Sequence, residues 1–240
     1  MNCAGLAVPE PYPLCLENGF TLEPLGDQAI LIRHEDCEAI AGVARTLREW
    51  RASWMGEMVP SYRAIAVFVN DDAIELDKAM EDLTHPLRQT SLGQAPPGKR
   101  WLVPCCYTLG PDLESASAAL KLQPRKLIDL HSGSDYTVYA VGFQPGFPYA
   151  GWLPEKLEGL PRRAEPRIRV EPGSVGITGK QTGIYPAASP GGWNLIGRTP
   201  CPLADLEQGW FAFAPGDRIR FFEITENDWP TLLGQRPQEG

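Results

Sequence analysis

Basic side chains are concentrated in one stretch of this acidic chain, residues 161–200. The 240 residues carry a formal net charge of -8, yet this stretch has six cationic side chains and only two carboxylates. Guanidinium and ammonium groups on an acidic protein favour a small anion, such as a carboxylate or a phosphate, over a polyanion. The sequence therefore predicts a compact anion site. Its cations are Arg162, Arg163, Arg167, Arg169, Lys180 and Arg198.

Glycine and proline dictate the backbone that must position these side chains. Residues 142–200 hold 11 of the 24 glycines and 9 of the 24 prolines. Glycine permits positive φ and a close approach to the main chain, whereas proline fixes φ and removes a hydrogen-bond donor. We therefore expect short strands joined by tight turns, without a long helix.

The first candidate group for binding an anion is the pair Arg162 and Arg163. Both lie between Pro161 and Pro166, which restrict their backbone. A guanidinium group held in place in this way suits a carboxylate or phosphate well. The alternative is a solvated surface or an internal salt bridge.

The second candidate group lies further along, where three glycine amides could form an anion-holding concavity. Lys180, Gln181 and Thr182 would supply its donors; ordinary hairpin geometry is the alternative. A Walker phosphate loop is not expected, because Gln181 follows Lys180 and no helix follows. The three glycines are Gly176, Gly179 and Gly183.

Aromatic side chains crowd the same segment. Because such rings are favoured in cores and at interfaces, we expect these roles rather than stacking on a substrate. His131, at a predicted helix end, is a further candidate, although such a histidine ordinarily donates to a main-chain carbonyl. The candidate substrate or interface residues are Phe143, Gln144, Phe147, Tyr149, Tyr185, Trp193, Asn194 and Arg198.

Composition excludes several functional classes. A sequence pI near 5.0 argues against general binding of nucleic acid or anionic membranes. The six cysteines form no C-x-x-C pair and only three histidines are present, so no metal site is expected. No Ser or Cys nucleophile can be combined with a base and an orienting acid by spacing. Without a signal peptide or a long apolar run, the chain is expected in the cytoplasm, with free thiols.

Patterning along the chain predicts two domains. Residues 1–19 form a Pro-rich extension, and residues 20–96 a small α+β domain whose first helix has an apolar stripe from Ile40 to Trp54. Asn70, Asp71 and Asp72 can cap a second helix, which Pro86 ends or kinks. The segment Gln94–Gly98 is the expected linker.

The second predicted domain spans residues 97–226 and is mainly β. Asp112 is expected to cap one short helix, and Pro124 to begin another that ends near His131 and Gly133. The strands that follow need closure to protect their edges, which favours a barrel. Residues 227–240 are expected to be a loose tail.

Four motifs resemble those of the family formed by the B-type subunits of bacterial 5-oxoprolinase, which also includes sporulation kinase inhibitors and allophanate hydrolase subunit 1 proteins. The resemblance extends over about residues 20–225 in one register, and the sequence departs from the family by a shorter stretch at Cys105–Gly110. The motifs are G-F-Q-P-G-F-P-Y from Gly142, P-R-R-A-E-P-R-I-R-V from Pro161, G-S-V-G-I-T-G-K-Q-T-G-I-Y-P from Gly173 and S-P-G-G-W-N-L-I-G-R-T-P from Ser189.

This resemblance implies a fold, an activity and partners. It sharpens the barrel to a cyclophilin-like one and implies ATP-dependent opening of 5-oxoproline to L-glutamate, with ATP and Mg²⁺ bound by a complex with C-type and A-type subunits. The motif match points to Arg163 and Arg167 as functional residues, and the chain alone is expected to be inactive. The alternatives are an inhibitor that binds a histidine kinase and a carboxyltransferase component of a urea or allophanate pathway.

Limited proteolysis tests the predicted domain boundary. Because linkers are cleaved before packed elements, a stable fragment should begin between Gln94 and Trp101, as read by N-terminal sequencing. Dominant cleavage inside residues 142–200 would contradict the predicted organisation.

Overall fold

A computed structural model describes residues 13–70, 74–89 and 98–240 of the chain. The chain divides into two compact units, Met1–Ala95 and Pro96–Gly240. Most of the second unit is antiparallel sheet with few helices. The expected linker, apart from Gly98, and the expected capping residues Asp71 and Asp72 lie outside the described residues.

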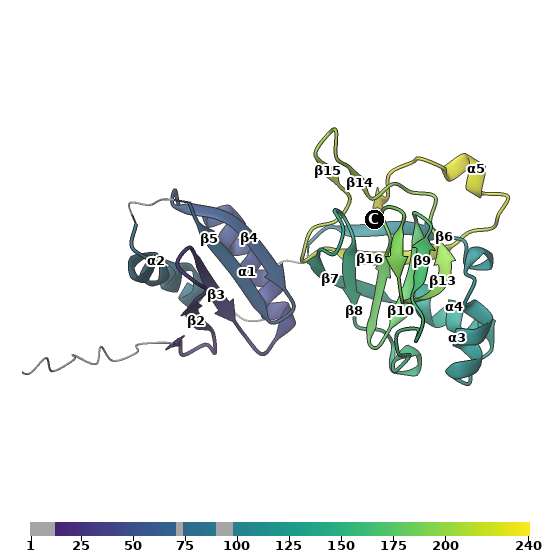
Figure 1. Ribbon diagram of the computed structural model, residues 1–240, viewed down its shortest axis with the longest axis horizontal. Coiled ribbons are helices and arrows are strands. Elements are labelled where there is room, and N and C mark those ends of the chain that lie inside the picture. Colours follow the sequence, from purple (N-terminus) through teal and green to yellow (C-terminus); the bar gives the residue numbers. More distant parts are fainter. Residues whose placement is uncertain (1–12, 71–73, 90–97) are drawn as a thin grey trace, which may run out of the picture. The chain divides into compact units, whose positions relative to one another are not determined.

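The first unit places two helices on one face of an antiparallel sheet. Its strands pair in the order β1-β2-β3-β5-β4, and α1 and α2 contact each other and the sheet (Figure 1). Alternate residues of the central strands, such as Ile30, Ile32 and Ile65, are buried because they face the helices. The elements are β1 Leu14–Cys15, β2 Thr21–Pro24, β3 Ala29–Arg33, α1 Cys37–Trp50, β4 Met55–Ser61, β5 Ala64–Val69 and α2 Leu76–Gln89.

The helices of this unit follow local rules with two exceptions. Asp36 caps α1 by accepting a hydrogen bond from the amide of Glu38 at 2.8 Å. The apolar stripe predicted for the first helix, Ile40 to Trp54, was too long, because α1 ends at Trp50. Trp54 lies beyond the helix, where it is buried and its indole donates to Asp82 at 3.1 Å. Pro86 was expected to end or kink the second helix; it does not end α2, which continues to Gln89 with Pro86 inside it.

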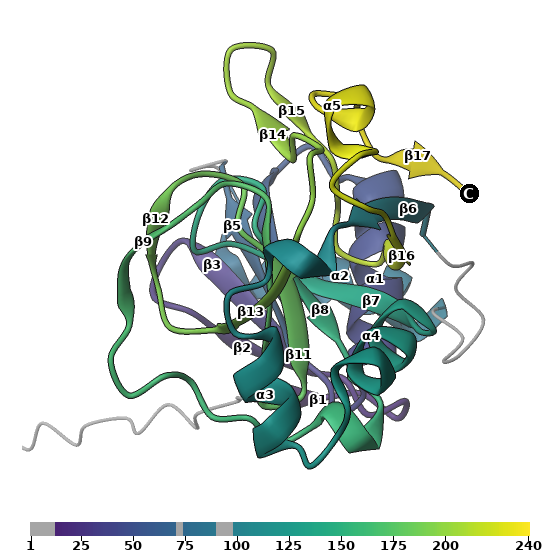
Figure 2. The same ribbon diagram turned by 90° about the vertical axis from the view of Figure 1, so that its right-hand side faces the viewer.

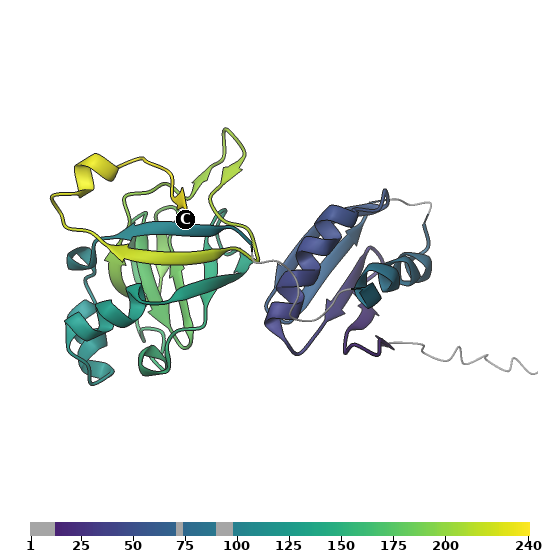
Figure 3. The same cartoon turned by 180° about the vertical axis from the view of Figure 1, so that it is seen from behind.

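The strands of the second unit form one series, β17-β6-β16-β7-β8-β11-β10-β13, in which only β6 and β16 are parallel. Figure 3 shows β6, β16 and β7 side by side. A bridge between Cys106 and Arg198 joins the end of β6 to the end of β13. These strands are β6 Arg100–Cys105, β7 Asp135–Val141, β8 Pro148–Gly151, β10 Ser174–Thr178, β11 Gln181–Ile184, β13 Asn194–Arg198, β16 Arg218–Glu223 and β17 Gln238–Glu239.

Short elements surround this series. Helices α3 and α4 pack together beside the strands (Figure 2), and α4 begins at Pro124 and ends before Gly133, as predicted. Two further strand pairs, β9 with β12 and β14 with β15, stand apart from the series. The remaining elements are η1 Tyr107–Leu109, α3 Leu113–Ala119, α4 Pro124–Ser132, η2 Glu155–Leu157, β9 Arg167–Val170, β12 Ser189–Gly191, β14 Ala204–Asp205, β15 Trp210–Phe211 and α5 Trp229–Leu232.

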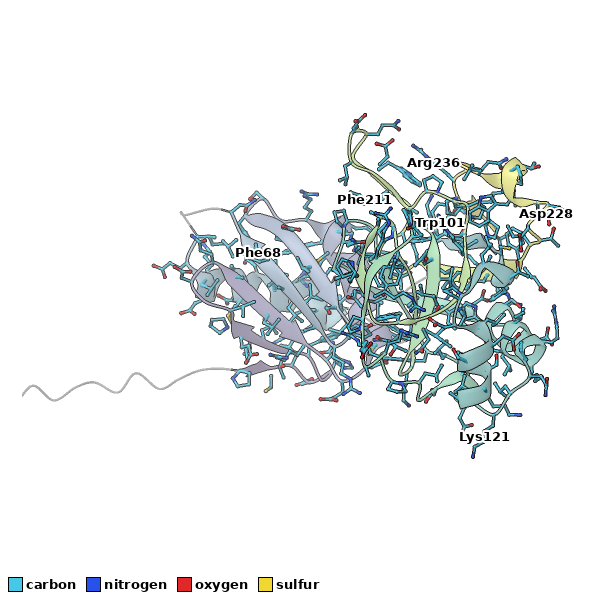
Figure 4. The ribbon with its side chains drawn as sticks, turned by 45° about the vertical axis from the view of Figure 1, so that its right-hand side comes forward. Phe68, Trp101, Lys121, Phe211, Asp228 and Arg236 are labelled. Carbon is cyan, nitrogen blue, oxygen red and sulfur yellow. The ribbon has the colours of Figure 1, made fainter. Side chains whose placement is uncertain are left out.

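The C-terminal residues are not the loose tail that the sequence suggested. β17 pairs antiparallel with β6, since Gln238 lies opposite Leu102. Arg236, labelled in Figure 4, lies 4.1 Å from the ring centroid of Trp210 and donates to Gln208 at 3.0 Å. Main-chain pairing and a cation–π contact therefore attach this segment to the second unit.

The turn before α3 depends on a glycine. A side chain at Gly110 would overlap the main-chain carbonyl of Ile196, so only glycine permits this approach. We expect Gly110→Ala to lower the free energy of unfolding by about 1–3 kcal/mol, measured by urea denaturation. Gly142→Ala is the matched control, because nothing lies within 4 Å of its added methyl group. Equal stability of the two variants would contradict the close approach.

Candidate functional site

A buried carboxylate, Asp112, organises the basic segment. Its side chain is 4% exposed. Its Oδ2 accepts from the amide of Leu195 at 2.7 Å, and its Oδ1 accepts from Arg163 at 3.0 Å and from Arg167 at 2.6 Å. Sequence reasoning treated Asp112 as a helix cap, but its side chain makes no capping bond because it binds these three donors instead. Three donors compensate its burial.

Arg163 and Arg167, the main candidates for anion binding, are thus brought together by an internal ion pair. The Arg163 side chain is 38% exposed and the Arg167 side chain 23% exposed. One terminal nitrogen of Arg167, Nη1, is buried without a hydrogen-bond partner among the described residues. The arginines hold β9 and the preceding loop against the start of α3, and only Arg167 retains an unused buried donor.

The aromatic candidates converge on a pocket of about 190 Å³. Phe147 packs edge-to-face on Tyr185 and on Trp193, with centroid distances of 5.1 and 5.5 Å. These three rings are buried, whereas Phe143 is 62% exposed at the rim. The pocket is lined by Phe143, Phe147, Tyr149, Arg162, Pro166, Tyr185, Pro190, Gly191, Gly192 and Trp193.

Two tyrosines give this apolar pocket hydrogen-bonding groups. Burial raises the pKa of Tyr149 and of Tyr185, and the positive charge of Arg162 opposes the rise in both. Both hydroxyls therefore stay protonated near neutral pH. The Tyr185 oxygen accepts a hydrogen bond from the Trp193 amide, so its own proton remains available as a donor.

His131 and Thr182 belong to a buried network in the core. His131 Nδ1 lies 2.7 Å from the Tyr107 hydroxyl, and its Nε2 lies 2.9 Å from Thr182 Oγ1. Thr182 donates in turn to the carbonyl of Gly176 at 3.2 Å. The expected bond from His131 to a main-chain carbonyl is wrong, because both ring nitrogens face side chains. Burial lowers the pKa of His131 to about 3, so the ring is neutral.

The hairpin that carries Lys180 and Gln181 does not enclose an anion. Gly176 and Gly183 lie opposite each other within the β10–β11 ladder, and Lys180 lies in the turn, 3.0 Å from Glu158. Tyr185 follows the other end of β11, so the pocket and this turn lie at opposite ends of the hairpin. The concavity expected from three glycine amides is therefore replaced by strand pairing, and Gln181 pairs with Gly151 of β8.

The other polar candidates serve the local structure. Asn194 donates to the carbonyls of Pro161 and Ile177 at 3.0 and 3.3 Å. Arg198 donates to the carbonyl of Pro172 at 2.8 Å and lies 5.4 Å from the ring centroid of Trp229. The side-chain oxygen of Gln144 is buried without a partner among the described residues. These contacts fix loops around the aromatic pocket.

Comparisons with known proteins cover most of the chain. The family model for the carboxyltransferase domain, subdomain C and D, matches residues 20–213. The chain is 34% identical over 231 residues to the B-type subunit of 5-oxoprolinase from Bacillus subtilis, covering 88% of this chain and 95% of that protein. It is 38% identical over 209 residues to the B-type subunit of 5-oxoprolinase from Escherichia coli, covering 82% and 93%.

A solved structure gives the same picture at the level of the backbone. The crystal structure of the protein TTHA0988 matches with a TM-score of 0.70 and 30% identity. The match covers 82% of this chain and 40% of that chain, so the chain spans less than half the length of this solved relative. No helix in the described parts of this chain is long and apolar enough to cross a membrane.

The Asp112 ion pair predicts an order of stabilities. Asp112→Asn leaves Arg167 without a charged partner, so we expect a loss of about 3 kcal/mol in the free energy of unfolding. Arg163→Ala should cost less than Arg167→Ala, because Arg163 is more exposed. Asp129→Asn, which affects an exposed pair with Arg125, should stay within about 0.5 kcal/mol. Chemical denaturation of the four variants provides the measurement, and equal losses for Asp112→Asn and Asp129→Asn would refute this order.

The buried imidazole predicts acid sensitivity. The folded-state pKa of His131 is about 3, below the ordinary value near 6.5, so the unfolded chain binds more protons between these values. Its contribution to stability is complete above pH 6.5 and is lost as the pH falls towards 3. Between pH 6.5 and 4 this loss should reach about 3 kcal/mol.

Denaturation at several pH values, compared with His131→Gln, isolates this contribution. The variant should be less stable at pH 7 but should lose less stability on acidification. His85→Gln is the control, because His85 is exposed. Parallel pH profiles for the wild type and His131→Gln would show that the imidazole is not the responsible group.

Proposed function

We propose that this chain is the B-type subunit of an ATP-dependent 5-oxoprolinase. The chain belongs to the family of the carboxyltransferase domain, subdomain C and D, and its relatives in that family are B-type subunits of 5-oxoprolinase. The observation that carries this proposal is identity of 34% over 95% of the length of the Bacillus subtilis protein of that name. The reaction opens the lactam of 5-oxoproline to give L-glutamate. The chain would be one part of a hydrolase complex.

The chemistry of the second unit supports an acidic, cyclic substrate. 5-Oxoproline combines a carboxylate with a small ring and a lactam carbonyl. The aromatic pocket offers apolar walls, hydroxyl donors and the guanidinium of Arg162. We further propose that Arg163 and Arg167 support this site by fixing β9 and its loop; the ion pairs of both arginines with Asp112 support this role.

The described part of the basic segment offers no phosphate loop for ATP. The segment that comes nearest to a phosphate loop is the β10–β11 hairpin, whose lysine pairs with Glu158. The aromatic pocket, of about 190 Å³, is also smaller than the roughly 300–1,000 Å³ of pockets that typically bind drug-sized ligands. We therefore propose that ATP, with Mg²⁺, is bound by the complete complex, and we assign it no contact here.

A C-type subunit and an A-type subunit are the proposed partners. The relatives are named as B-type subunits, which implies a protein of several subunits. The solved relative is a longer chain in which the matched part is joined to further sequence, as a fused partner would be. The five described cysteines are free thiols, which suits the proposed location in the cytoplasm.

We also propose a cyclophilin-like barrel for the second unit. Its support is the strand series from β6 to β13, whose ends are linked by reciprocal main-chain bonds between Cys106 and Arg198 of 2.8 and 3.0 Å. Such a link leaves fewer open strand edges. Within this arrangement the small α+β unit would precede the barrel in the chain.

Carboxyl transfer is the second candidate function, because the matching family model carries that description. Inhibition of a histidine kinase is the non-enzymatic alternative implied by the sequence resemblance. Neither alternative requires ATP hydrolysis that depends on 5-oxoproline, so that activity distinguishes the proposed function from both.

Reconstitution tests the proposed function. The chain alone should be inactive, because no phosphate loop or nucleophile triad was found in its sequence, whereas the mixture with the C-type and A-type subunits should hydrolyse ATP when 5-oxoproline is added. Phosphate release and glutamate formation are measured for each protein alone and for the mixture. Activity of the isolated chain would rule out a shared site. Kinase inhibition without turnover by the mixture would favour the inhibitor.

A further inference from the structure

Most cations of the basic segment are already engaged within the chain. Arg163 and Arg167 bind Asp112, and Lys180 pairs with Glu158. Arg169 donates to Glu171 at 2.7 Å, and Arg198 to a main-chain carbonyl. These partners neutralise or occupy the groups, which leaves them less able to bind a ligand.

Arg162 is the exception. To the residues that the structure describes, it makes neither an ion pair nor a side-chain hydrogen bond, although it lines the aromatic pocket. It lines this pocket together with Tyr149 and Tyr185, and its positive charge opposes the rise in the pKa of both hydroxyls. An unpaired guanidinium next to two protonated hydroxyls attracts an anionic group.

The walls of the pocket define the rest of the ligand. The rings of Phe147, Tyr185 and Trp193 form a rigid edge-to-face cluster. A small ring fits against the apolar lining of this pocket, whereas a nucleotide is too large for about 190 Å³. Gly191 keeps this space open, because a methyl group there would lie 2.5 Å from the Tyr185 hydroxyl.

Resting on the function proposed above, we propose that this pocket is the site for the 5-oxoproline substrate and that Arg162 binds the substrate carboxylate. The lactam ring packs on the aromatic walls, and the hydroxyls of Tyr149 and Tyr185 donate hydrogen bonds to the oxygens of the ligand. Arg162 is thereby the residue that selects acidic ligands over neutral lactams of the same ring size.

Binding to the full-length chain tests the role of Arg162 directly. L-5-Oxoproline and the neutral ring 2-pyrrolidinone are titrated near pH 7.5 and followed by nuclear magnetic resonance. Because Arg162 is exposed, the effect of Arg162→Gln lies at the low end for a charged hydrogen bond, about a tenfold weaker affinity for 5-oxoproline. Its affinity for 2-pyrrolidinone should not change.

Arg169→Gln is the matched control, because it removes one positive charge from the same segment without touching the pocket. It should bind both probes within about twofold of the wild type. Thermal unfolding of both variants verifies that folding is unchanged. An equal loss of affinity for 5-oxoproline in the two variants overturns the proposal, and so does a wild-type affinity in Arg162→Gln. The proposal also fails if 5-oxoproline binds neither to the chain nor to its mixture with the partner subunits.

Turnover by the reconstituted complex separates this inference from the proposed function. If the wild-type complex hydrolyses 5-oxoproline and Arg162→Gln leaves KM unchanged, the substrate lies elsewhere and the proposed function stands. If the wild-type complex is inactive but the chain binds 5-oxoproline through Arg162, the proposed function fails and the binding site stands. The expected result is an increase of about tenfold in KM for Arg162→Gln, with ATP binding unaffected.

Discussion

The need to compensate one buried negative charge constrains the whole basic segment. A carboxylate removed from water is strongly destabilising unless donors surround it, and Asp112 receives an amide and two guanidinium groups. Its three donors come from a loop, from β9 and from β13, so the ion pair joins three pieces of chain that share no strand ladder. The loop that holds Arg163 also holds Arg162 beside the aromatic pocket. The position of the pocket rim therefore depends on a charge that does not line the pocket.

In the second unit, the buried polar network around His131 and the aromatic cluster beside the pocket are separate. Its interior contains a neutral imidazole held by two hydroxyls, which satisfies a buried polar group without introducing a charge. The aromatic cluster of Phe147, Tyr185 and Trp193 lies apart from this network in a smaller core of its own. Such a division allows the pocket to present donors while the strands beneath it remain fixed.

Local patterns in the sequence predicted what local physics controls. The helix α1 was foreseen from its apolar periodicity, and α4 from the proline at its start and the glycine after its end, because these signals lie within a few positions of each other. The glycines and prolines likewise indicated the short strands. The partners of Asp112 are 51, 55 and 83 residues away, and no spacing rule links them. Nor does any spacing rule link His131 to its partner Thr182, which is 51 residues away. For the same reason the sequence did not show that Arg163 and Arg167 form an internal ion pair with Asp112. The sequence G-P-D-L at Gly110–Leu113 lies within the stretch that resembles the family, and it was the signal that could have identified Asp112.

The parallel pairing of β6 with β16 has a consequence for biosynthesis. Arg100 lies opposite Arg218, and Cys105 opposite Glu223, so the first strand of the second unit pairs with residues 118 positions later in the chain. β17 then adds to the other edge of β6. While the ribosome is still translating, β6 therefore has no partner on either edge, and its apolar residues Leu102 and Val103 stay uncovered. Contacts between such distant segments also slow folding. An unpaired apolar strand is an aggregation hazard until its partners have been made.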